Sequence, residues 1–412
     1  MKMKKWMRLL ICFGVVSLIA CGNKESENNQ EEIIQPEETV EEVPEIIRPQ
    51  IKLSKQGYEE FWVISDKYIL YKENGKYGVM DYSEQVVIPA EYDFGNNLYA
   101  KKMVLLGNKV ENEYECRLFD ENMQQIFQND NYKEFTIASV NEGVLQLINA
   151  DLSCSIYLDM QNDYQELFRL SEEEVEGYYS STAFSNGYVL VCTNIYLDEG
   201  FPNVVDKEGN ITFLTQNGKM YYTYISYAIG EDGWILCYEV DMEHPDQFSN
   251  GFLNINTREF VPLPEDKTYV KQIRGQDGIY HATYQNLALI SESAEKEEYY
   301  IFDIVNQKLL NHTPYKYVEL NDYGKERILY ATVKNDKWGY LDSEFQPIQA
   351  VYDDASSYNE DGYAWIYQNG MEYLIDLEGN VVSDGYEGQE VSRDFGLFKL
   401  VNEEKKYFVI VE

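Results

Sequence analysis

The feature that most limits the fold of this chain is an internal repeat. The segment 75–93 (GKYGVMDYSEQVVIPAEYD) aligns with the segment 336–353 (DKWGYLDSEFQPIQAVYD) after one inserted residue, Tyr82. Weaker copies end a strand-like run with Asp or a substitute, at Asp81, Asp120, Asp159, Asp206, Asn256, Asp303, Asp342, Asp376 and Glu412. The landmarks are 34 to 50 residues apart, with a mean near 41, which is typical of a four-stranded propeller blade. The sequence therefore predicts an all-β repeat array.

The ends of this array predict that it closes into a ring. The last unit is short of outer strands, whereas residues 51–65 contain strand-like runs ahead of the first full unit. We expect the N-terminal segment to complete the last blade, because ring closure removes exposed sheet edges. The landmarks give nine units, and propellers usually have up to about eight blades. We expect a β-propeller of about eight blades, with seven or nine allowed and an open β-solenoid as the alternative.

Two copies of the repeat carry a motif in which Lys precedes an aromatic residue and Gly, and Asp follows three residues after the Gly. The motif residues are Tyr77, Gly78 and Asp81 in one copy and Trp338, Gly339 and Asp342 in the other. The motif resembles that of the WG β-repeat family. The resemblance implies a propeller-like array, often on exported bacterial proteins, and no common catalytic activity. Physically, we expect the ring to pack in the core, the Gly to allow a close backbone approach, and the Asp to bond to turn amides.

The N-terminus predicts export and a lipid anchor. Four basic residues and an apolar run from Leu9 to Ala20 are typical of a secretory signal peptide. The run Leu18-Ile19-Ala20-Cys21 resembles a bacterial lipobox, which implies cleavage before Cys21 and acylation of that residue. Segment 22–50 contains nine Glu and no aromatic residue, so it is predicted to be a disordered tether. We therefore divide the chain into a signal peptide (1–20), a lipidated Cys with an acidic tether (21–50) and a repeat domain (51–412), held on the outer face of a bacterial cell membrane.

The charge of the chain excludes two classes of partner. The formal net charge is −38, and such a field repels both nucleic acid and anionic lipid head groups. The bilayer is expected to be contacted through acylated Cys21 alone. Surface acid also keeps an exported protein soluble, which is the simpler explanation of the charge.

No motif in the sequence carries recognisable chemistry. His244, His281 and His312 lie far apart and in no paired metal-binding pattern, and no nucleophile elbow or phosphate loop occurs. The acidic stretch 198–210 lacks the ligand order of an EF-hand and is predicted to be a hairpin turn. We therefore predict no catalytic residue, metal or cofactor.

The cysteines of the repeat domain also match no metal or redox spacing. These are Cys116, Cys154, Cys192 and Cys237. Because they are predicted to lie in strands of different units, we expect buried thiols rather than disulfides.

Tyrosine is the unusual component, with 37 residues. Most should pack in the scaffold, but rigid rings with a hydroxyl also suit recognition. The densest stretch, 219–239, predicts a partly exposed recognition surface made of Tyr221, Tyr222, Tyr224 and Trp234. Insertions within 194–203 and 241–250 lengthen neighbouring units and are expected on the binding face. We expect a non-catalytic module that binds a protein partner at the cell envelope. The alternatives are binding of a wall glycan and, less favoured, a glycan hydrolase.

Overall fold

The computed structural model divides the chain into two units, residues 1–47 and 48–412. It describes residues 51–98, 101–111, 113–193, 202–223, 227–244, 246–275, 279–320, 327–359, 361–385, 391–394, 397–402 and 405–411. Cys21 and the predicted tether lie outside this part. The described residues contain no helix that is long and apolar enough to cross a membrane.

The strands of the second unit pair into a series of antiparallel sheets. The first four of these sheets use strands in unbroken chain order. The sheets are β2 (Glu60–Val63) to β5 (Val86–Tyr92) with β3 (Tyr68–Glu73) and β4 (Lys76–Asp81) between them; β6 (Phe94–Leu98), β7 (Met103–Val110), β8 (Glu113–Phe119) and β9 (Gln125–Gln128); β10 (Phe135–Asn141), β11 (Val144–Asn149), β12 (Ser155–Asp159) and β13 (Gln165–Leu170); and β14 (Tyr178–Ser181), β15 (Tyr188–Thr193), β16 (Pro202–Asp206) and β17 (Ile211–Phe213).

The next four sheets include all the two-residue strands. A two-stranded sheet of β24 and β25 is inserted between β23 and β26. The strands are β18 (Thr215–Gln216), β19 (Lys219–Thr223), β20 (Trp234–Asp241), β21 (Phe248–Asn254) and β22 (Phe260–Pro262); β23 (Tyr269–Val270), β24 (Ile273–Arg274), β25 (Tyr280–His281), β26 (Leu287–Ser291), β27 (Tyr300–Asp303) and β28 (Lys308–Leu309); β29 (Tyr315–Val318), β30 (Ile328–Thr332), β31 (Trp338–Leu341) and β32 (Pro347–Tyr352); and β33 (Asp354–Ala355), β34 (Ala364–Gln368) and β35 (Met371–Ile375).

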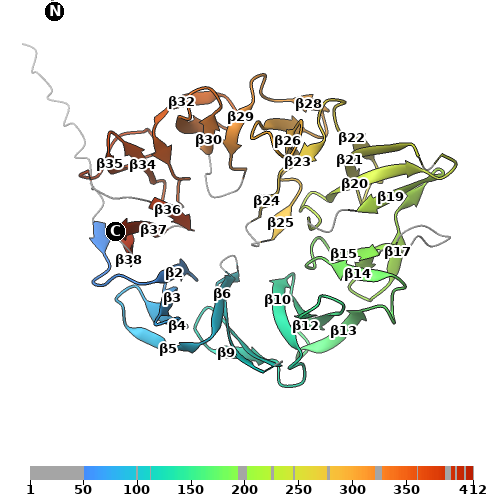
Figure 1. Ribbon diagram of the computed structural model, residues 1–412, viewed down its shortest axis with the longest axis horizontal. Helices are drawn as coiled ribbons and strands as arrows, with labels where there is room; N and C mark the ends of the chain where they lie inside the picture. Colours follow the sequence, from blue (N-terminus) through green and yellow to red (C-terminus); the bar gives the residue numbers. More distant parts are fainter. Residues whose placement is uncertain are drawn as a thin grey trace, which may run out of the picture. The chain divides into compact units, whose positions relative to one another are not determined.

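The last sheet closes the ring, as the sequence predicts. It contains β36 (Val391–Asp394), β37 (Leu397–Asn402) and β38 (Lys405–Val411), and the N-terminal strand β1 (Ile51–Leu53) pairs with β38. Figure 1 shows the sheets of this unit around a common centre. Within the described residues there are nine sheets of three to five strands. The predicted closed β-propeller is confirmed, and its number of sheets lies within the range of seven to nine that the sequence allows. Because β1 pairs with the last strand, the array is not an open solenoid.

The repeated Asp residues are scaffold, because each holds the turn that follows its strand. The Asp81 carboxylate accepts hydrogen bonds from the backbone N–H groups of Ser83 and Gln85, both at 2.9 Å. Asp342 holds the equivalent turn after β31 in the same way, through Glu344 and Gln346. One landmark was misplaced, because in the sheet of β21 the turn is held by Asn254 rather than Asn256. The landmark Glu412 lies outside the described residues.

The two motif rings pack against the inner strand of their own sheet. Tyr77 stacks on Trp62 with ring centroids 5.8 Å apart. Trp338 lies 5.2 Å from Tyr317 in the corresponding position. Both motif rings are half-buried, so they pack against the neighbouring strand without being enclosed in the core.

The lysines of the two motifs also have equivalent roles. Lys76 pairs with Asp93 at 2.5 Å, and Lys337 pairs with Asp353. Each Asp also accepts a backbone N–H from the next sheet, from Lys109 and Asn369 respectively. The motif therefore ties its own sheet to the following one.

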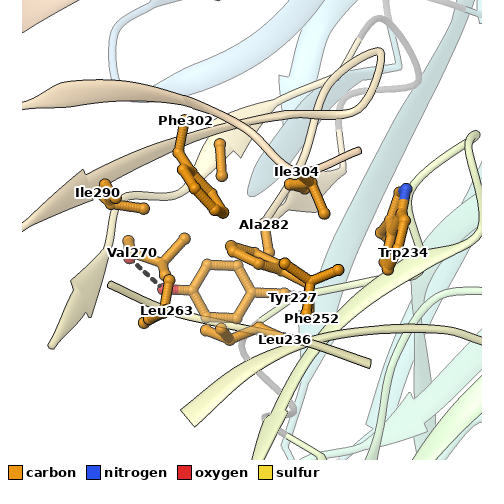
Figure 2. Packing of buried hydrophobic residues seen from close by; sticks show 12 residues of the cluster. Tyr227, Trp234, Leu236, Phe252, Leu263, Val270, Ala282, Ile290, Phe302 and Ile304 are labelled. Carbon is orange, nitrogen blue, oxygen red and sulfur yellow. Dashed lines mark hydrogen bonds between the residues drawn. The ribbon is translucent and has the colours of Figure 1, made fainter. Parts of the chain in front are cut away.

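The hydrophobic core lies between adjacent sheets rather than at one centre. Figure 2 shows the cluster between the sheet of β20 and β21 and the sheet of β26 and β27, where Phe252 and Phe302 stack with centroids 6.3 Å apart. The Tyr227 hydroxyl donates a hydrogen bond to the Val270 carbonyl at 2.7 Å within this cluster. Comparable clusters fill the other seams.

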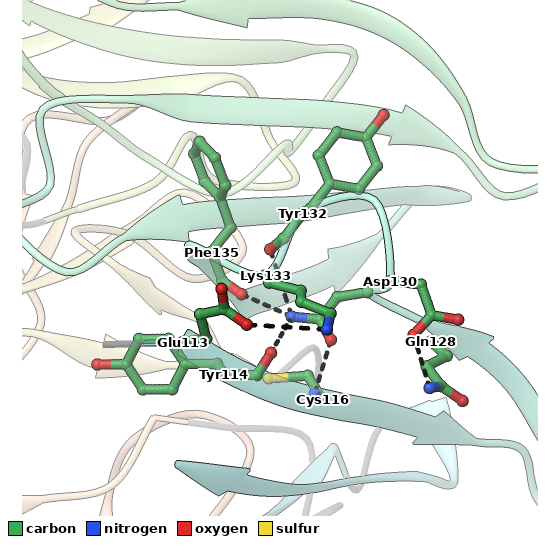
Figure 3. Close-up of polar contacts among 9 residues, drawn as sticks. Glu113, Tyr114, Cys116, Gln128, Asp130, Tyr132, Lys133 and Phe135 are labelled. Atoms are coloured by element: carbon green, nitrogen blue, oxygen red, sulfur yellow. Dashed lines mark hydrogen bonds and ion pairs between the residues drawn. The ribbon is translucent and has the colours of Figure 1, made fainter. Parts of the chain in front are cut away.

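Buried asparagines hold the connections between sheets. The Asn129 side chain accepts the backbone N–H of Cys116 at 2.8 Å and donates to the carbonyls of Tyr114, Tyr132 and Phe135 (Figure 3). Asn311 makes the same kind of bonds in a later sheet, accepting from Ile301 and donating to Tyr299 and Thr313. Each amide satisfies backbone groups at a strand end that would otherwise be buried without a partner.

The four cysteines occur in four different sheets or at their edges, as free thiols. Cys116, Cys192 and Cys237 are buried, and Cys154 is half-buried just before β12. Burial raises the pKa of the Cys116 and Cys237 thiols, so these groups stay protonated at neutral pH. The expectation of buried thiols is confirmed for three of the four residues.

Candidate recognition surface

Two of the four residues predicted to form a recognition surface are core residues. Tyr221 is 5% exposed and Trp234 is 3% exposed. Tyr221 packs in the cluster with Leu190, and its hydroxyl donates to the Glu239 carboxylate at 3.1 Å. Trp234 packs with Phe252, and its indole N–H donates to Asn286 at 2.9 Å. The prediction that these two residues face a partner is wrong, because both sit in a seam between sheets.

The other two predicted residues have different outcomes. Tyr222 is half-buried, and its hydroxyl lies 3.6 Å from the Cys192 sulfur. That contact and burial raise the pKa of Tyr222 to about 12. Tyr224 lies outside the described residues.

A partly exposed surface with aromatic residues lies at one end of the same sheet. Strands β20 and β21 form a long hairpin whose register runs from Trp234↔Asn254 to Val240↔Phe248. Its first half is buried: residues 234–237 have little exposure, whereas residues 238–241 are half-buried. The hairpin therefore begins in the core and ends beyond it.

The end of the hairpin and the adjoining strand β19 carry three aromatic side chains and one valine on one face, and we call these residues (Tyr222, Tyr238, Val240 and Phe248) the aromatic patch. Tyr222 pairs with Tyr238, and Val240 pairs with Phe248 across the strands. Because Tyr238 and Val240 are two residues apart on β20, all four lie on the same side of the sheet. The Phe248 ring meets the Tyr238 ring edge-on, with centroids 5.7 Å apart.

Phe248 is the most exposed large apolar residue in the described part of the chain, at 65%. It lies in a paired strand, so its position is fixed by backbone hydrogen bonds rather than by a loop. Phe252, on the same strand and the same face, is fully buried. Strand β21 therefore carries one Phe in the core and another Phe exposed to solvent.

The connection that follows β20 has a counterpart at the same point of the chain in the two neighbouring sheets. Residues 194–201 connect β15 to β16, residues 242–247 connect β20 to β21, and residues 292–299 connect β26 to β27. In the sheets of β15 and β26 this connection joins the second and third strands, and in the five-stranded sheet, which has β18 as an extra strand at its edge, it joins the third and fourth. In a closed propeller equivalent connections lie on one face of the ring, so the connections from β20 to β21 and from β26 to β27 share that face. The insertion predicted within 194–203 lies outside the described residues over 194–201, so the expectation that it shares this face with the insertion 241–250 stays a prediction.

Carboxylates border the aromatic patch. Asp241 ends β20, and Glu243 and Asp246 follow in the connection to β21; the last two are exposed. His244 is 3.8 Å from Asp241 and largely exposed, as expected for a solvated loop residue. Hydrogen bonds from the Glu243 and His244 backbone lower the pKa of Asp241, so it stays ionised at neutral pH.

The two other histidines have no visible chemical role in the structure. His281 is buried in β25, and its Nδ1 lies 3.0 Å from the Ile229 carbonyl. His312 is exposed. Among the described residues, no group of three or more His, Cys, Asp or Glu side chains could hold a metal ion.

One carboxylate pair needs separate consideration, since glycan hydrolysis needs two carboxyl groups. Glu372 and Asp354 both pair with Tyr367, from opposite sides of β34. Burial, with a smaller contribution from the Asp354 charge, raises the pKa of Glu372 to about 7. Glu372 is only 3% exposed, so a polysaccharide cannot reach it in this arrangement.

Comparisons with known proteins assign no family to this chain. No family model and no curated protein matches the chain. Among solved structures, the chain is similar to a eukaryotic initiation factor (10% identity, 82% of this chain and 91% of that chain, TM-score 0.45). It is also similar to the WD40 domain of SCAP from fission yeast (7%, 88% and 94%, 0.34) and to the Cps50 (Swd1) β-propeller domain of Myceliophteria thermophila (12%, 76% and 94%, 0.32). The assignment of the propeller therefore depends on the strand pairing described above.

Proposed function

We propose that this protein is a non-catalytic bacterial lipoprotein, anchored through Cys21 on the outer face of the membrane, whose propeller binds a protein partner at the cell envelope. The aromatic patch is the binding site. The observation that carries the proposal is the 65% exposure of Phe248 on a paired strand.

An exposed Phe at this position has a hydration cost that a scaffold role does not explain. Full burial of such a side chain is worth about 1.5–3 kcal/mol. Phe and Tyr are enriched at protein interfaces, where their rings contribute large contact areas. The neighbouring ring of Tyr238 supports Phe248 from one side, which leaves the other side for a partner.

The N-terminal pattern supports the anchor. A lipobox-like run ends at Cys21 and is followed by an acidic segment without aromatic residues. Two or three acyl chains hold a protein on a bilayer far more firmly than one. We expect an acidic tether of this length to hold the propeller away from the membrane surface.

The proposal is tested by affinity capture with the full chain in detergent. Wild-type protein and Phe248→Ala are immobilised and offered solubilised envelope proteins and, separately, purified wall polysaccharide from the source organism. We expect a specific protein to be retained by the wild type and retention to fall at least about tenfold in the variant, as for a truncated hot-spot residue. Equal retention by the two proteins contradicts the proposal, and retention of polysaccharide alone replaces it with glycan binding.

A further inference from the structure

We infer that the partner contacts the aromatic patch with a cationic segment, in which Lys or Arg side chains accompany apolar ones. This inference rests on the proposed function and specifies the chemistry of its partner. It is carried by the charges that surround Phe248 and by the way this chain already pairs cations with aromatic rings.

The first set of charges comes from the hairpin itself. Asp241, Glu243 and Asp246 lie between Val240 and Phe248 in the sequence, at the end of the hairpin that carries the patch. Among the described residues, no lysine or arginine lies within ion-pair distance of Glu243 or Asp246. These two carboxylates are therefore available to a cation on a partner.

The second set comes from the next sheet. Asn250 pairs with Tyr238 across the hairpin, and its side-chain amide donates to the Thr268 carbonyl at 3.5 Å. The Thr268 hydroxyl in turn donates to the Glu292 carbonyl at 2.5 Å. These bonds bring the acidic segments around Asp266 and Glu292 next to the hairpin. The Asp266 and Glu292 side chains pair with Lys267 and Lys296. These two carboxylates are thus already paired within the chain, but the segment 292–298 as a whole remains acidic, with four Glu and one Lys.

Elsewhere in this molecule, lysine ammonium groups lie over tyrosine rings. The Lys267 ammonium lies 4.5 Å from the centre of the Tyr300 ring. The Lys271 ammonium lies 4.6 Å from the Tyr299 ring and 4.3 Å from the Tyr317 ring. Each is a cation–π geometry. Among the described residues, no lysine or arginine lies over Phe248, although carboxylates border it.

Charge and ring geometry favour the same class of partner. An exposed aromatic ring inside a border of carboxylates attracts a guanidinium or ammonium group by both ion pairing and cation–π contact. An acidic partner would bring like charges together around the patch. A cationic peptide segment with apolar residues satisfies the ring and the border at once.

The test uses the detergent-solubilised full chain and two labelled 12-residue peptides, one alternating Arg with Leu and Tyr and one with Glu in place of each Arg. Binding is measured by fluorescence anisotropy at 50 and 300 mM NaCl. We expect the Arg peptide to bind at least tenfold more tightly than the Glu peptide and to lose about tenfold in affinity at the higher salt, because salt screens exposed charges.

Matched variants separate a local effect from the overall charge. The double variant Glu243→Gln/Asp246→Asn removes two carboxylates beside the patch. The control Glu208→Gln/Glu259→Gln removes two exposed carboxylates from turns at the opposite end of the blades, Glu208 in the preceding sheet and Glu259 in the sheet of the patch itself. We expect the first variant to weaken binding of the Arg peptide at least fivefold and the control to change it less than twofold.

The outcomes distinguish this inference from the proposed function. Equal binding of the two peptides, or equal effects of the two double variants, overturns the cationic segment. In that case the proposed function remains valid if a protein partner is captured by the wild type and lost in Phe248→Ala. Loss of Phe248 dependence in the capture experiment removes both.

Discussion

Phe252→Ala is expected to lower the free energy of unfolding by about 3–5 kcal/mol, which is typical of removing a buried Phe ring. Phe252 is fully buried and stacks on Phe302 in the seam between two sheets. In a propeller each sheet is held largely by its neighbours, so a cavity in one seam weakens the ring as a whole. Urea unfolding followed by Trp fluorescence measures the change, because Trp234 packs in the same cluster.

The matched control for this prediction is Phe248→Ala. It makes the same chemical change on the same strand and the same face, at a position that is 65% exposed. We expect its free energy of unfolding to stay within about 0.5 kcal/mol of the wild-type value, as for surface substitutions. If the two variants are equally stable or equally unstable, the burial assigned to this strand is wrong.

Gly78→Ala is expected to cost about 3 kcal/mol, at the upper end of the range for overpacking. A Cβ at this position would lie 2.6 Å from the Ile88 carbonyl oxygen and 2.7 Å from the Ala90 nitrogen. Both are backbone atoms of the neighbouring strand, where the register shifts between Tyr77 and Val79. The strand cannot move aside without breaking its pairing, so the midpoint of thermal unfolding should fall.

Gly75→Ala provides the comparison in the same hairpin. Gly75 has a φ of +76°, and nothing lies within 4 Å of an added Cβ. The free energy of unfolding of this variant should fall by about 1 kcal/mol, which is the backbone strain of Ala in a left-handed conformation. A Gly78→Ala variant that is no less stable than Gly75→Ala would show that the close approach of the two strands is absent.

The fold was predictable because the repeat fixes a period. Turn-holding residues such as Asp81 and Asp342 recur at blade spacing, and the aromatic-Gly pair marks a strand with a close neighbour. The sequence could not choose between Asn254 and Asn256, because both side chains can hold a turn and only the strand register decides. Closure by β1 was predictable since the last unit lacks a strand.

The candidate site was predictable only in part. Composition pointed to the right sheet, but neighbours such as Tyr221 and Tyr222 face opposite sides of a strand, and the sequence does not say which side is buried. Residues on one side can also differ along the strand, as Phe252 and Phe248 do. The signal for Phe248 was an aromatic residue within the insertion 241–250, where the hairpin extends beyond its neighbours.

The central claim, that a protein partner occupies the aromatic patch, is tested most directly by placing a photo-crosslinking amino acid at position 248 of the full chain in cells of the source organism. Position 305 is the control, because Val305 is 57% exposed but lies in the turn between β27 and β28, at the opposite end of its sheet from the inserted connections. We expect irradiation to yield one discrete protein adduct from position 248 and none of that mass from position 305. The same adducts from both positions, or no protein adduct from position 248, would contradict the claim.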